Sequence, residues 1–335
     1  RKQRSGEDFL LGNRRVPLLL VLGTTVATMV GTGSSMGAVG KGYSDGLAGT
    51  LYGIGGAAGI LLLAFLFGDV CKYQFMTFSE EIAFYYGANR RIKGLVAVLI
   101  LLASVGWLGA HIMGGGMYLA WVVGIDLLSA KIIVALGFGI YVVIGGYMAV
   151  VWTDTIQALI LFFGFILMAG MALFRIGGME GLQMAMGKDP FIFLQGDRLL
   201  PSISLAFVIF VGVMATPAYR QRIYSSDTPQ TVRRSFYWSG SLYLLFSVFP
   251  AIIGIAAYQF DPGLANSNFA FPFLATEVLP VGAGLIVLIA GLSATMSSAS
   301  SDAIAGVSIL LRDIFILVTG QMPDKAKSVQ YSRWG

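Results

Sequence analysis

The run Ile60-Leu61-Leu62-Leu63-Ala64-Phe65-Leu66-Phe67 contains no polar residue. A strand of a membrane barrel alternates apolar and polar residues over about ten positions, so this run excludes a barrel. A helix satisfies its own backbone hydrogen bonds inside lipid, and no other open structure does. The run therefore predicts a membrane-crossing helix, and we expect the chain to be an all-α polytopic membrane protein.

The composition agrees with this prediction. Of the 335 residues, 56% are hydrophobic and 12% are charged, against about 25% charged residues in soluble proteins. The mean hydropathy of +0.79 leaves too little polar surface to cover a soluble fold of this size. This excludes an ordinary soluble enzyme. One histidine and one cysteine cannot form a zinc site, and we expect no catalytic residues.

Apolar stretches bounded by charged or turn residues predict eight membrane-spanning segments. They are residues 16–38, 47–68, 94–123, 128–151, 153–174, 201–219, 236–259 and 279–312.

The basic residues indicate the orientation of these segments. The net charge is +5, but the 22 lysines and arginines lie in short stretches beside the apolar runs and form no patch for nucleic acid. If residues 1–15 are cytoplasmic, seventeen basic residues, including Arg220 and Arg222, fall on the cytoplasmic side and five on the other. Basic residues favour the cytoplasmic side. We therefore predict a multi-pass protein of the plasma (inner) membrane with residues 1–15 in the cytoplasm.

The first predicted segment is rich in glycine, serine and threonine between Gly23 and Gly40. One interpretation is close helix packing, which small residues permit. The other is a helix that unwinds between Val30 and Ser34 and lines a binding site, as broken helices do in transporters.

The last predicted segment carries five serines between Ser293 and Ser301. Ser297 and Ser301 are four residues apart and share a helix face. One interpretation is that each hydroxyl bonds to a carbonyl of its own helix. The other is a wall of oxygen atoms for a small cation, since hard cations prefer oxygen ligands.

Charged residues, the single histidine and one proline give further predictions. Asp154 lies at the predicted turn between the fourth and fifth segments, where it either serves an ion or complements a helix dipole. His111, with no acid near it in sequence, is either a packed neutral side chain or a substrate contact. Pro217 is expected to break the sixth segment. Glu80 and Glu81 are expected to be solvated in a cytoplasmic loop.

Three segments have specific patterns. Residues 145–157 have the pattern GG-x-x-AV-x-WTD-x-x-Q, residues 219–222 read YRQR, and residues 294–315 have the pattern A-x-M-S-S followed by R-D-I with Phe315 in place of the usual tyrosine. Residues 10–15 and 42–47 add weaker matches. These segments resemble the sodium/solute symporter family, which includes sodium-coupled sugar, proline, pantothenate, choline and sialic acid transporters.

The resemblance implies a LeuT-type fold with two inverted repeats of five helices. On this mapping, residues 1–335 form a single transmembrane transporter domain, in which residues 1–175 hold the first repeat and residues 201–335 hold the first three helices of the second. The leading helix and the last two core helices of the family are expected to be absent from this sequence, which then looks truncated.

The resemblance also implies a set of site residues. Sodium, the one ion expected, would be bound by backbone oxygens of Ala27, Val30 and Ala294 and by the hydroxyls of Ser297 and Ser298. A second sodium would use Asp154, Ser297, Ser300 and Ser301. The residues implied for substrate binding are Gly33, Ser34, Ser35, Tyr52, His111, Thr216 and Tyr219.

The resemblance therefore implies a sodium-coupled symporter that imports a small polar solute by alternating access. The expected partners are a small molecule, such as an amino acid or carboxylate, and the lipid bilayer, but no nucleic acid. Sugar carriers have glutamate or glutamine at several substrate positions where this chain has glycine and serine, so a polyol is not the expected substrate. The alternative is a membrane sensor with the same fold that binds its ligand without moving it.

Overall fold

The computed structural model describes residues 5–187, 190–321 and 325–334, and these residues form helices joined by short connections, without a β-strand among them. Arg1, Lys2, Arg4 and Lys188, which contribute to the charge count above, lie outside the described residues. The helices in chain order are α1 (Gly6–Leu11), α2 (Leu18–Met29), α3 (Ala38–Asp45), α4 (Thr50–Phe67), α5 (Phe78–Tyr85), α6 (Arg90–Val123), α7 (Leu127–Arg175), α8 (Gly178–Met186), α9 (Leu199–Ala215), α10 (Pro217–Ser225), α11 (Pro229–Phe246), α12 (Val248–Phe260), α13 (Ala270–Phe273), α14 (Val281–Ile309), α15 (Phe315–Thr319) and α16 (Lys325–Trp334).

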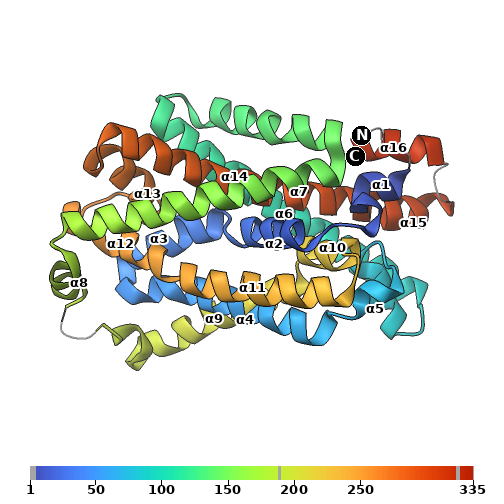
Figure 1. Ribbon diagram of the computed structural model, residues 1–335, viewed down its shortest axis with the longest axis horizontal. Helices are drawn as coiled ribbons and strands as arrows, with labels where there is room; N and C mark the ends of the chain where they lie inside the picture. The colour runs from blue at the N-terminus through green and yellow to red at the C-terminus, as the bar shows by residue number, and fades with distance from the viewer. Residues whose placement is uncertain (1–4, 188–189, 322–324, 335) are drawn as a thin grey trace.

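Most of the long helices run along the longest axis of the molecule (Figure 1). Within the described residues, six helical segments are long and apolar enough to cross a bilayer, and α2 is a shorter apolar helix. The count differs from the eight predicted segments for two reasons. The 49-residue helix α7 contains both the fourth and the fifth predicted segments, and the first predicted segment is broken, so that α2 is shorter than a membrane span. The prediction of an all-α polytopic membrane protein is confirmed.

Helix α7 reverses direction at Gly146, and its two halves lie beside each other (Figure 1). Gly146 has φ +60°, and a Cβ atom there would lie 2.7 Å from the backbone oxygen of Phe9. Both features require glycine. The predicted turn between residues 151 and 153 is therefore wrong, because the apolar pattern continues past the real turn. Asp154 lies about two turns inside the second half of α7, where it is fully buried.

Two helices are broken in their middle. Helix α2 ends at Met29, and the chain resumes as a π-helical turn, η2 (Gly33–Gly37), that leads into α3. Only Val30 and Gly31 are non-helical, so the predicted unwinding is confirmed over a shorter stretch. Helix α9 ends at Ala215, and α10 begins at Pro217, which confirms the predicted break there.

The long helices pack in two groups (Figure 1). Helix α4 packs against α9 and α11, and α3 packs against α12, whereas α14 packs mainly against the two halves of α7 and against α6. Helix α2 contacts α11 of the first group and α7 of the second, and α12 also contacts α7. The first broken helix is therefore one of the elements through which the two groups meet.

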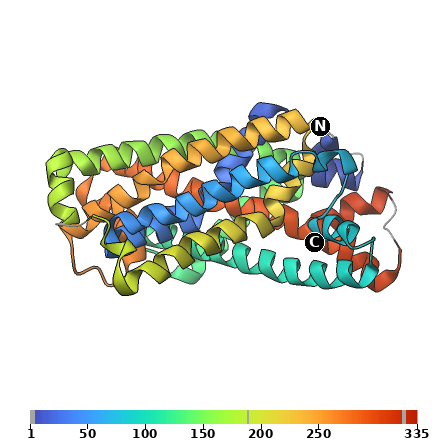
Figure 2. The same ribbon diagram turned by 90° about the horizontal axis from the view of Figure 1, so that it is seen from below.

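Both termini lie at the same end of the molecule, together with α1, α5, α15 and α16, while α8 lies at the opposite end (Figures 1 and 2). The segments predicted to be cytoplasmic thus gather at one end. The assignment of that end to the cytoplasm remains a prediction from the basic residues.

Glu81 is not solvated, and the prediction for this residue is wrong. It is fully buried, and its Oε1 atom accepts a hydrogen bond of 2.9 Å from Nη1 of Arg220. The hydroxyl of Tyr224 donates to its Oε2 atom at 2.5 Å. The Arg220 guanidinium also lies 3.7 Å from the ring centre of Phe67. Arg220 therefore fixes α5 against α10 and is not a solvated topological charge.

We predict that Glu81→Ala lowers the free energy of unfolding by about 3 kcal/mol, because it leaves the buried Arg220 cation without its partner. The neighbouring Glu80 is partly exposed and pairs with Lys93 at 3.2 Å. Glu80→Ala, the matched control, is expected to cost about 1 kcal/mol or less.

The reactivity of the Cys71 thiol can be used to measure the unfolding temperature of both variants. It is the one cysteine in the sequence, it is buried in η4 (Val70–Tyr73), and burial raises the pKa of its thiol. It should react with a fluorogenic maleimide mainly after unfolding, as the protein is heated in detergent. Equal unfolding temperatures for the two variants would contradict the structural role of Glu81.

Candidate functional site

The break in α2 lies against the serine-rich face of α14. Ser297 Oγ is 3.1 Å from the carbonyl oxygen of Ala27 and 3.1 Å from that of Ala294 in its own helix. All three residues are fully buried. Three of the predicted sodium ligands therefore lie together, one on α2 and two on α14.

The end of α2 explains this arrangement. The last carbonyls of a helix have no partner within it, and here serine hydroxyls supply the missing donors. Ser298 Oγ donates to the carbonyl oxygen of Thr28 at 3.2 Å, and Ser34 Oγ donates to that of Met29 at 2.9 Å. Val30, the other predicted ligand, ends the helix and is fully buried.

The residues predicted for a second sodium are only partly together. Asp154 Oδ2 accepts hydrogen bonds from Thr24 Oγ1 at 2.6 Å and from Ser301 Oγ at 3.1 Å. Ser300 Oγ instead donates to the carbonyl oxygen of Ser297, in its own helix, at 3.0 Å. Asp154 and Ser301 thus share one cluster, while the Ser300 hydroxyl bonds elsewhere.

Arg222 joins this cluster, and the sequence interpretation missed it. It was counted as a cytoplasmic charge, but its side chain is fully buried, with Nη2 3.2 Å from Asp154 Oδ2. It lies less than two turns after the break at Pro217. The one signal in the sequence was that an arginine follows closely on a helix break inside a membrane segment.

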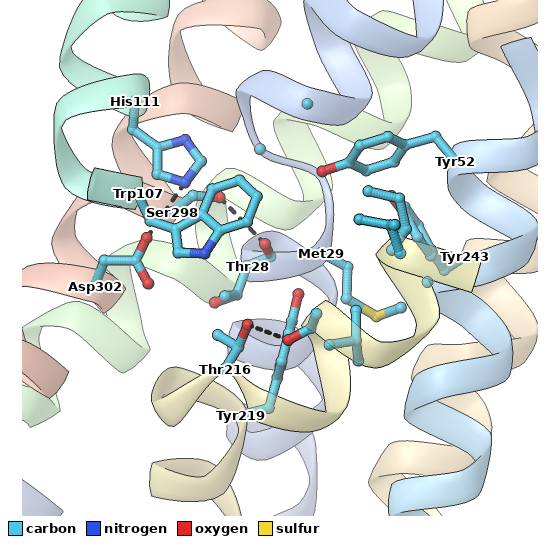
Figure 3. A pocket seen from close by; sticks show the side chains of 17 residues that line it. Thr28, Met29, Tyr52, Trp107, His111, Thr216, Tyr219, Tyr243, Ser298 and Asp302 are labelled. Atoms are coloured by element: carbon cyan, nitrogen blue, oxygen red, sulfur yellow. Dashed lines mark hydrogen bonds and ion pairs between the residues drawn. The ribbon is translucent and has the colours of Figure 1, made fainter. Parts of the chain in front are cut away.

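A cavity of about 150 Å³ lies between the two broken helices (Figure 3). Of the residues predicted to bind substrate, Gly33, Tyr52, His111, Thr216 and Tyr219 line it. Ser34 and Ser35 are buried off the cavity wall. The other lining residues are Thr28, Met29, Gly31, Gly56, Trp107, Val208, Ile209, Gly212, Val213, Tyr243, Ser298 and Asp302.

Because Gly33 has no side chain, the Tyr52 ring can pack closely against the backbone at this position in the cavity wall. A Cβ atom at this position would overlap the hydroxyl oxygen of Tyr52. A larger residue would therefore displace the Tyr52 ring, which the sequence also assigned to substrate binding.

His111 faces an acid that is remote in sequence. Its Nε2 atom lies 3.3 Å from Asp302 Oδ2, and its Nδ1 atom lies 2.9 Å from Thr32 Oγ1. In Figure 3, His111, Trp107 and Asp302 lie on one side of the cavity, and Tyr52 and Tyr243 lie on the other. The sequence interpretation missed Asp302 because 191 positions separate it from His111.

The cavity wall carries one carboxylate, that of Asp302, which lies beside His111. The Asp302 carboxylate is the acid among the lining residues, and those residues include neither lysine nor arginine. Four aromatic rings, those of Tyr52, Trp107, Tyr219 and Tyr243, share the wall with it. A carboxylate with aromatic faces attracts a positively charged group.

Known proteins resemble the chain along almost its whole length. The model of the sodium:solute symporter family matches residues 9–334. The sodium/pantothenate symporter of Haemophilus influenzae is 26% identical over 98% of this chain, and the sodium/glucose cotransporter of Vibrio parahaemolyticus is 26% identical over 93%. The chain spans 71% and 64% of the lengths of these two relatives.

The fold is similar to that of a solved structure, a Na⁺-coupled sialic acid symporter in a substrate-bound, outward-open state. The TM-score is 0.86 at 20% identity, and the match covers 99% of this chain and 73% of the other. This likeness confirms the expected transporter fold, and the relatives are transporters rather than enzymes. The chain therefore belongs to the sodium:solute symporter family and is a multi-pass membrane protein.

Proposed function

We propose that this chain couples the entry of sodium to the import of a small polar solute by alternating access. The observation that carries the proposal is the contact between the broken end of α2 and the serines of α14. The proposed sodium ligands are the backbone oxygens of Ala27, Val30 and Ala294 and the hydroxyls of Ser297 and Ser298.

The donor set fits a monovalent cation. The hydroxyl oxygen of Ser297 lies 3.1 Å from the carbonyl oxygen of Ala27 and 3.1 Å from that of Ala294. Small hard cations prefer such oxygen ligands. A serine hydroxyl can turn its hydrogen away and present a lone pair, because its rotation is free. None of these five ligands carries a formal charge, so the set suits a singly charged ion.

Two residues connect the proposed ion site with the cavity. Thr28 and Ser298 line the cavity, and they are joined by the hydrogen bond from Ser298 Oγ to the carbonyl oxygen of Thr28. Sodium bound across α2 and α14 would therefore fix one wall of the solute site. Coupling then follows from a higher sodium affinity in the conformation that keeps this contact.

We further propose that the solute carries a protonated amine, as amino acids and amines do. Asp302 supplies a carboxylate and the four rings of the wall supply apolar and π surface. A solute with only a carboxylate would lack a cationic partner among the lining residues, apart from His111. Within the expected range of amino acids and carboxylates, this favours the amino acids.

We predict that Ser297→Ala raises the sodium concentration needed for half-maximal uptake into proteoliposomes by about tenfold, because about 1.4 kcal/mol of binding free energy is lost with one ligand. Ser300→Ala is the matched control, since that buried serine bonds within its own helix. Its sodium dependence should stay within about twofold of the wild type.

Uptake that is unchanged when sodium is replaced by choline or potassium would contradict the proposed coupling. Equal effects of Ser297→Ala and Ser300→Ala would contradict the assigned ligand.

The amine proposal is tested with pairs of solutes in a thermal-shift screen in sodium, because a ligand stabilises the state that binds it. Each pair consists of an amino acid and the 2-hydroxy acid with the same side chain. The amino acid is expected to stabilise the protein, and Asp302→Asn should weaken its binding by about 10-fold to 100-fold, as loss of a charged hydrogen bond does. Equal stabilisation by hydroxy acids would contradict it.

A further inference from the structure

The guanidinium of Arg222 ends in a group of four oxygen atoms. Its Nη2 atom lies 2.9 Å from Thr24 Oγ1, 2.9 Å from Thr28 Oγ1 and 3.2 Å from Asp154 Oδ2, and it also contacts Ser301 Oγ. A terminal guanidinium nitrogen has two N–H groups. Four oxygens around it exceed the hydrogen bonds that it can donate, so the arrangement resembles a cage around a cation.

The four oxygens make a chemically coherent cation site. One belongs to a carboxylate and three belong to hydroxyl groups, a set typical of ligands for hard cations. They come from α2, the second half of α7 and α14. Ser301 is one turn beyond Ser297, so this site lies next to the proposed sodium site on the same two helices. Asp154 and Ser301 were themselves predicted to bind a second sodium.

The positive charge of Arg222 is permanent. Arginine stays protonated in proteins, and this side chain is fully buried. Its other terminal nitrogen, Nη1, donates to the carbonyl oxygen of Ala218 at 2.9 Å, within α10. A second cation placed among the same four oxygens would face this charge at close range in a medium of low dielectric constant, where like charges repel strongly.

We propose that Arg222 is the built-in cation of this second oxygen site, and that the protein consequently binds one sodium ion rather than two. The inference rests on the proposed function, because it takes the site of Ala27, Ala294 and Ser297 as the sodium site. It makes Arg222 the residue that sets the ion stoichiometry.

The consequence for the transport cycle follows from the position of α10. Arg222 lies on α10, the helix that begins at the second break, whereas its partner Asp154 lies on the second half of α7. A tethered cation at this point joins α10 to α7, as a free ion would join its ligands. It is not released to the cytoplasm, so it adds no ion to the coupling.

The experiment counts sodium ions bound by the purified full-length protein in detergent, with ²²Na⁺ alone as the probe. The wild type is expected to bind one ion per chain. Arg222→Gln removes the built-in charge, and this variant is expected to bind two. Adding Asp154→Asn to Arg222→Gln removes the carboxylate as well and should return the count to one.

Arg220→Gln is the matched control, because Arg220 is a buried arginine of the same helix whose acid partner is Glu81 and not Asp154. Its count should remain one. The single variant Asp154→Asn is also expected to remain at one, since Asp154 is paired with Arg222 in the wild type.

Two ions bound by the wild type would overturn the inference, and this result does not depend on the folding of any variant. A count in Arg222→Gln equal to that of the wild type would also overturn it. A wild type that binds no sodium while Arg222→Gln binds one would contradict the proposed function but support the role of Arg222. The two proposals are therefore tested separately.

Discussion

Inside a bilayer each backbone polar group needs a partner within the protein, because an unsatisfied group costs several kcal/mol. Helix α2 departs from the simplest solution, since it stops at Met29 and leaves its last carbonyls free of helical hydrogen bonds. Serine hydroxyls of α14 donate hydrogen bonds to these carbonyls across the contact between the two helices. The rest of the site depends on this substitution of side-chain donors for backbone donors.

The same constraint explains the buried charges near the second break. Arg220 and Arg222 lie within about two turns of Pro217, and each has a buried acid as its partner, Glu81 and Asp154 respectively. Unpaired, either charge would be strongly destabilising. The pairs connect α10 with α5 and with α7. Polar contacts of this kind join α10 to its neighbours at defined points.

The membrane-spanning segments and the two helix breaks could be predicted from the sequence, because they depend on residues that are close together in the chain. The apolar segments, the unwinding after Met29 and the break at Pro217 follow from hydropathy, from glycine-rich composition and from the missing N–H of proline. The serine face of α14 follows from a spacing of four residues. The turn at Gly146 was missed because apolar residues continue on both sides of it, so hydropathy gives no boundary there.

The sequence could not predict the charge partners, because these depend on tertiary packing. Asp302 meets His111 across 191 positions, and Arg222 meets Asp154 across 68. An arginine after a membrane segment is usually interpreted as a marker of the cytoplasmic side. That interpretation was wrong for Arg220 and Arg222, which follow the break at Pro217 and are buried inside the protein. The breaks themselves were visible in the sequence, but their partners were not.

Coupling depends on sodium binding where the broken end of α2 meets α14. A high-resolution structure of the protein in sodium, compared with one in choline, tests this binding. We expect a sodium-dependent density peak coordinated by the oxygens of Ala27, Ala294 and Ser297, with the guanidinium of Arg222 still beside Asp154. A sodium-loaded structure with no peak there, or with the ion at Asp154 in place of Arg222, would contradict it.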